Sequence, residues 1–152
     1  MKASDHRKFR NRSFSMLEAD LIESKAFLEL SGKAAIIALI RFHQKAHRKN
    51  ITSKKKGMKD MIITNQGEIV FTYAEAEELG MKSSRTFYKV IRELVVEKGF
   101  IDIAEPGEWY LNKPTRYSIS GRWKKYGTPN YQTVIIPRRL PDGIGFQKTN
   151  QK

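Results

Sequence analysis

The chain has 152 residues, about the size of one domain, and a formal net charge of +13 from 29 Lys and Arg against 16 Asp and Glu. Such an excess of positive charge favours a polyanionic partner, nucleic acid first and an anionic membrane surface second. The absence of cysteine excludes disulfides and thiolate zinc sites. The longest apolar run, residues 34–40, is too short to span a bilayer, and the basic N-terminus lacks the apolar core of a signal peptide. We therefore expect a cytoplasmic protein.

Charge and proline content divide the chain into three parts. Residues 1–13 are expected to form a flexible basic arm, and residues 14–127 the folded domain. Residues 128–152, which contain Pro129, Pro137 and Pro141, are expected to be an extended or disordered tail, with Arg138 and Arg139 as a possible contact to nucleic acid.

The first half of the domain reads as helical. Apolar residues between positions 16 and 30 predict a short helical or irregular segment that covers the core. Ser31 is then expected to cap a helix over residues 33–48, whose wide apolar face predicts a central position. His43 and His47 have metal-ligand spacing, but the sequence offers no third ligand, so no metal site is predicted.

A lysine-rich loop over residues 49–60 separates this helix from two short apolar segments, 61–64 and 68–71. The turn residues Asn65-Gln66-Gly67 between them predict a hairpin or a tight connection. One of the two segments is expected to pair with a later strand.

Residues 71–103 predict two helices joined by a turn and followed by a strand. Thr72 can cap the first helix, with Glu75 completing a capping box, and Gly80 suits the residue that ends it. Ser83 can cap the second helix, over about 84–98, and Gly99 ends it before a strand at 100–103. An apolar stripe on the second helix leaves polar and basic residues exposed: Ser84, Arg85, Tyr88, Lys89 and Arg92.

The following segment predicts a β-hairpin over about 100–119. Pro106-Gly107 forces a turn, and residues 113–119 form the returning strand. No acid occurs between residues 113 and 125, so Lys113 and Arg116 are expected to be free for phosphates. Trp123, farther along, is expected to pack against the core rather than to stack on bases.

The residues from Thr72 to Ile103, together with 113–119, resemble a winged helix-turn-helix DNA-binding domain. The resemblance implies an α+β fold with a second helix that enters the major groove and a hairpin wing beside it. One departure is the spacing from Leu94 to Gly99, five residues where four are usual, which predicts a longer helix or a bulge near Val95 and Val96. The segments A-F-L-E-L-S-G-K-A-A and N-Q-G-E-I-V-F-T-Y-A-E-A also resemble the opening of winged-helix replication initiators of plasmids and phages.

The predicted function is sequence-specific binding of double-stranded DNA, as a replication initiator or accessory factor, or as a transcriptional regulator, of a mobile element. The expected DNA-binding residues come from the second helix, the turn before it and the hairpin: Lys82, Ser83, Ser84, Arg85, Tyr88, Lys89, Arg92, Lys113, Thr115 and Arg116. The alternatives are a winged-helix protein-interaction module and an RNA-binding protein, the latter disfavoured because A-form major grooves exclude a helix. No enzymatic activity, cofactor or metal is predicted, and homodimerisation stays open.

Overall fold

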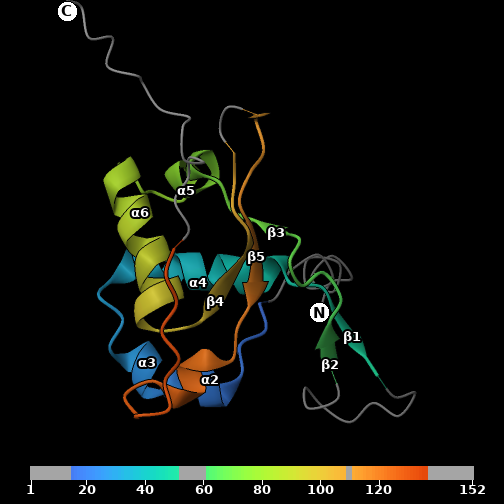
Figure 1. Cartoon of the computed structure of the whole chain (residues 1–152), viewed down its shortest axis with the longest axis vertical. Coiled ribbons are helices and arrows are strands. Elements are labelled where there is room, and N and C mark those ends of the chain that lie inside the picture. Colours follow the sequence, from blue (N-terminus) through green and yellow to red (C-terminus); the bar gives the residue numbers. More distant parts are fainter. Residues whose placement is uncertain (1–14, 52–60, 109–110, 137–152) are drawn as a thin grey trace, which may run out of the picture.

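The computed structural model describes residues 15–51, 61–108 and 111–136, which form an α+β fold (Figure 1). The predicted arm, most of the lysine-rich loop, and Arg138 and Arg139 lie outside these ranges. No helix within them is long and apolar enough to cross a membrane. The helices are α2 (Ala19–Glu23), α3 (Lys25–Leu28), α4 (Lys33–Lys45), α5 (Tyr73–Glu78), α6 (Ser84–Arg92), the π-helix η2 (Glu93–Glu97) and the 3₁₀-helix η4 (Arg122–Lys125).

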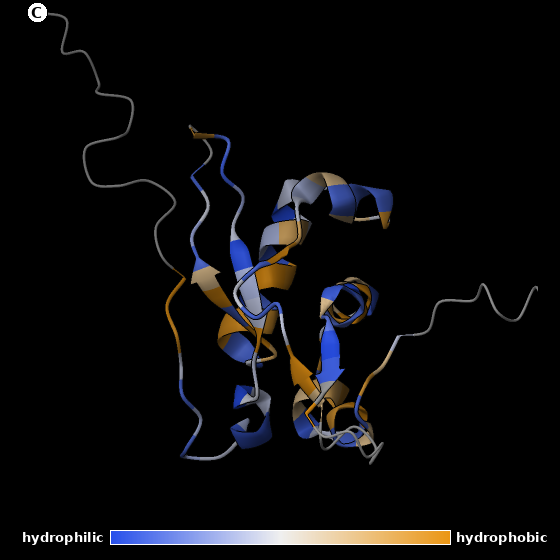
Figure 2. Cartoon of the chain, turned by 90° about the vertical axis from the view of Figure 1, so that its right-hand side faces the viewer, coloured by the Kyte–Doolittle hydropathy of each residue, from blue (hydrophilic) through white to orange (hydrophobic). Residues whose placement is uncertain are grey.

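The strands form two small antiparallel sheets. β1 (Arg48–Asn50) pairs with β2 (Met61–Ile63), and Figure 2 shows this ribbon as one hydrophilic and one apolar strand. β3 (Ile69–Val70), β5 (Arg116–Ile119) and β4 (Ile101–Glu105) form the second sheet in that order. The expected pairing of one apolar segment with a later strand is confirmed by β3 and β5.

Of the two connections expected between segments 61–64 and 68–71, the structure has the tight turn and not the hairpin, since β2 pairs with β1 and β3 belongs to the other sheet. The Asn65 side chain explains the difference. Its oxygen accepts from the His47 backbone N–H at 2.8 Å, and its amide donates to the Lys45 carbonyl at 2.9 Å. These bonds fasten the turn to the end of α4, so the chain passes from one sheet to the other.

The limits of α4 also differ from the expectation. Gly32 occupies the N-cap position without a side-chain bond, so Ser31 is not the cap. Instead, the Ser31 backbone N–H and hydroxyl donate to the Glu93 carboxylate, at 2.7 and 2.6 Å. The helix ends at Lys45 rather than 48, because Ala46 is extended and leads the chain into β1.

Aromatic side chains join the central helix to the other elements. The ring of Phe42 on α4 lies 5.2 Å from that of Phe71 and 5.1 Å from that of Tyr117 on β5, and Phe87 of α6 packs on Phe71 at 5.7 Å. These contacts fix the inner face of α6 against the core and turn its other face outward. Trp123 is also buried, which confirms that it packs against the core.

The packed part of the chain continues past residue 127, where the sequence suggested that the domain ends. Residues 128–136 have extended or turn-like backbone, yet Val134 and Ile136 pack against the core. Figure 2 shows this apolar end of the described chain running beside the sheet.

Candidate nucleic-acid interface

Local hydrogen bonds and one glycine determine where α5 and α6, the two helices of the candidate site, begin and end. The Thr72 hydroxyl accepts from the Glu75 N–H at 3.3 Å, and the Ser83 hydroxyl accepts from the Thr86 N–H at 3.5 Å, so both predicted caps are confirmed. Gly80 has a φ of +96°, the left-handed conformation expected of the residue that ends α5.

The predicted capping box at α5 forms only in part. The Glu75 carboxylate does not reach back to the Thr72 backbone, because it pairs with Arg41 at 3.6 Å and with Lys45. Both cations belong to α4. The carboxylate therefore fastens α5 to the central helix instead of closing its own first turn.

The two faces of α6 are those that the apolar stripe predicted. Phe87, Val90 and Ile91 are buried. The opposite face exposes the predicted residues of the helix, and the turn before it exposes two more: Lys82, Ser83, Ser84, Arg85, Tyr88, Lys89 and Arg92.

The second helix changes geometry after Arg92. Residues 93–97 form the π-helix η2, which confirms the bulge predicted near Val95 and Val96 from the five-residue spacing. Gly99 follows with a φ of +74°, and a Cβ there would lie 2.8 Å from the Cβ of Arg122. Only glycine therefore fits this position without displacement of its neighbours.

The cations of α6 and its preceding turn have no acid within ion-pair distance in the described parts of the chain; they are Lys82, Arg85, Lys89 and Arg92. Arg85 lies in the first turn, where a positive charge opposes the helix dipole, and no acid there offsets it. α5 exposes Glu77 and Glu78 instead. The positive charge of Arg85 therefore does not serve to stabilise α6.

The hairpin formed by β4 and β5 differs from the expectation in its charge. Glu105 pairs with Lys113 and with Arg116, the latter at 3.7 Å, so these two cations are not free of acids. The hydrogen bond from Lys113 and its charge hold the pKa of Glu105 below its ordinary value, and the same bond raises the pKa of Lys113. A register shift between Ile103 and Glu105 places Glu105 opposite Arg116, which the sequence did not reveal.

Thr115 also has a structural role. Its hydroxyl accepts from the Gly107 N–H at 3.0 Å, and a Cβ on Gly107 would lie 2.7 Å from the Thr115 nitrogen. The returning strand begins at Arg116 rather than at 113, and Lys113 forms an isolated bridge with Glu108. In Figure 1 the distal part of this hairpin lies at the same end of the molecule as α5 and the start of α6.

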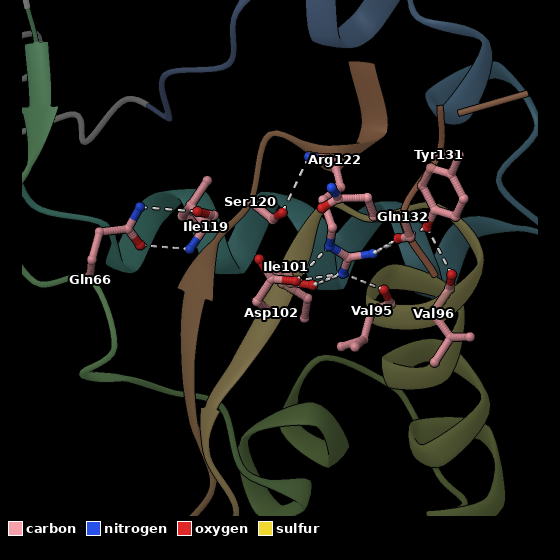
Figure 3. A network of polar contacts seen from close by, with 10 residues as sticks. All are labelled: Gln66, Val95, Val96, Ile101, Asp102, Ile119, Ser120, Arg122, Tyr131 and Gln132. Atoms are coloured by element: carbon pink, nitrogen blue, oxygen red, sulfur yellow. Dashed lines mark hydrogen bonds and ion pairs between the residues drawn. The ribbon is translucent and has the colours of Figure 1, made fainter. Parts of the chain in front are cut away.

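Arg122, a basic residue that follows the hairpin, is part of the fold. Its guanidinium donates to Asp102 at 2.7 Å and to the Val95 carbonyl at 2.6 Å (Figure 3). The Tyr131 hydroxyl donates to the Val96 carbonyl at 2.8 Å. These two side chains satisfy carbonyl groups of the π-helix, so Arg122 is not available to a partner.

His43 is a buried structural residue. An Arg48 N–H points at its Nδ1 over 2.8 Å, and burial, followed by the charge of Arg48, lowers the pKa of His43 to about 4. The imidazole is therefore neutral at pH 7, with Nδ1 as acceptor. No group of three His, Asp or Glu side chains arranged to hold a metal ion occurs within the described ranges.

Comparison with known proteins found no matching family model, no matching curated protein and no matching solved structure. Function is therefore inferred from the geometry of the exposed α6 face and its surroundings.

Proposed function

We propose that this protein binds double-stranded DNA sequence-specifically as a winged helix-turn-helix protein. In this proposal α5 and α6 form the helix-turn-helix, α6 is the recognition helix, and the β4–β5 hairpin is the wing. The observation that carries the proposal is the contrast between cations. Those on α6 and its preceding turn are exposed and have no acid within ion-pair distance among the residues that the structure describes, whereas Lys98, Lys113, Arg116 and Arg122 are paired with acids.

The position of each cation suggests its role. An α-helix fits the major groove, and residues in its first turns reach the base edges. Arg85 is on the exposed face of the first turn, so we assign it to a guanine, whose O6 and N7 accept two hydrogen bonds from arginine. Lys89 and Arg92 lie farther along the same face and contact phosphates. Lys82 precedes the helix and contacts a phosphate on the other side.

The test begins with selection of a preferred duplex from random sequences. Arg85→Ala should then lose about 1–3 kcal/mol on the selected duplex and relax the preference at one position. Lys89→Ala should weaken the selected and a scrambled duplex equally, and make the log–log salt slope about one unit shallower.

Two results would contradict the proposal. One is a folded Arg85→Ala variant that binds and discriminates like the parent protein. The other is a parent whose affinity for duplex DNA hardly depends on salt, because three phosphate contacts predict a slope of about −3. Equal or tighter binding to duplex RNA would favour the RNA-binding alternative instead.

A further inference from the structure

An open groove of about 610 Å³ lies between the start of α4 and one side of α6 and η2. Three exposed cations line it: Lys33 from α4, and Lys89 and Arg92 from α6. None of the three has an acid within ion-pair distance in the described chain. The groove thus extends the positive face of α6 onto a helix that the sequence did not connect with it.

A contact from Ser31 to the buried carboxylate of Glu93 holds the start of α4 beside α6. The backbone N–H and hydroxyl of Ser31 donate to Glu93, which is 5% exposed and begins the π-helix. Two short bonds between residues 62 positions apart fix the first turn of α4 against the end of α6. The packed structure therefore fixes the backbone position of Lys33 relative to α6.

The charge of the groove favours an anion. Its lining holds three cations against two carboxylates, Glu93 and Glu97, so it has a net positive charge, and both oxygens of Glu93 already accept hydrogen bonds from Ser31. Glu97 is an exposed acid of the lining. Lys33 is the first residue of α4, a helix with no acid in its first turn, so its charge opposes the helix dipole as that of Arg85 does in α6.

We infer that this groove receives the sugar–phosphate backbone of the DNA strand that borders the major groove, with Lys33 contacting a phosphate next to those held by Lys89 and Arg92. The inference rests on the proposed function. Helix-turn-helix proteins use elements outside the recognition helix to contact the backbone, and a polyanion of regularly spaced phosphates matches cations shared between two helices.

The test compares Lys33→Ala with Lys125→Ala, a matched control on η4 that removes an exposed lysine outside the groove. Lys33→Ala should lower the affinity for selected and scrambled duplexes by the same factor, about fivefold at 0.15 M salt, and make the salt slope about 0.9 shallower. Lys125→Ala should change neither. Glu97→Gln, which removes the exposed acid of the groove, should tighten binding to both duplexes.

Phosphate ethylation interference identifies the contact directly. One phosphate should be required by the parent protein and not by Lys33→Ala. Melting of each variant confirms that it is folded. If the parent binds with an Arg85-dependent preference but Lys33→Ala matches it in affinity, slope and interference, this inference fails and the proposed function stands. If the parent shows no salt-dependent binding to duplex DNA, both fail.

Discussion

Replacement of Glu105 by Gln is expected to tighten DNA binding, because this carboxylate neutralises two cations of the β4–β5 hairpin. Glu105 pairs with Lys113 and Arg116, and its lowered pKa keeps it ionised at neutral pH. The amide of Gln keeps the size of the side chain and removes the charge. Both cations are then free to contact phosphates, provided that the hairpin lies against DNA as the wing of the proposed complex.

The magnitude follows from counterion release. Each added phosphate contact steepens the log–log salt slope by about 0.9, so two contacts give up to about two units and at most roughly thirtyfold tighter binding at 0.15 M salt. The three side chains of the pairs are 40–46% exposed. Ion pairs at such positions contribute little to stability, so the melting temperature should stay close to that of the parent protein.

The assay is a salt titration of binding to a selected and a scrambled duplex. Glu23→Gln is the matched control, since it makes the same change in net charge on α2, outside the hairpin and the groove. Both duplexes should gain equally from Glu105→Gln, because phosphate contacts carry no sequence information. An unchanged slope, with affinity no higher than that of the control, would refute the idea that these two cations face DNA.

Two further predictions concern stability. The folded-state pKa of His43, about 4, lies below the ordinary 6.5, so the unfolded chain takes up the proton first as the pH falls. The free energy of unfolding should therefore decrease by roughly 3 kcal/mol as the pH falls from 6.5 to 4. Urea unfolding at several pH values should show that His43→Gln lacks this decrease. Parallel pH profiles of the variant and the parent protein would contradict the prediction. Tyr131→Phe removes the bond to the Val96 carbonyl and should cost about 1–2 kcal/mol in thermal unfolding; an unchanged melt would show that this bond does not stabilise the C-terminal segment.

The sequence predicted the parts of the fold that depend on near neighbours. Thr72 and Ser83 cap helices through bonds to residues three positions on, and Gly80 and Gly99 end them with positive φ angles. Such signals act within about one helical turn, so they can be read without knowledge of the rest of the chain. The bulge before Gly99 was one of two alternatives, and it was predicted from a departure from the spacing usual in winged helix-turn-helix domains rather than from a local signal.

Contacts between distant residues could not be predicted in this way. Ser31 stands where a helix cap is usual. A buried carboxylate needs hydrogen-bond donors, however, and Glu93 accepts from both the backbone N–H and the hydroxyl of Ser31. Glu105 meets Arg116 because of a local register shift, which no count of acids along the chain contains. The same holds for the candidate site. The exposed face of α6 was predicted from its local pattern, whereas the extension of this positive surface to Lys33 was not.

The π-helix links the proposed recognition helix mechanically to the C-terminal segment. Its wide turn leaves the carbonyls of Val95 and Val96 to Arg122 and Tyr131, and Arg122 also holds the Gln132 carbonyl at 3.1 Å. A pull on the C-terminal end of the described chain would load these side-chain bonds. The force would then arrive at the end of η2, directly below α6. Tension from anything attached to the C-terminal residues would thus act on the angle of that helix.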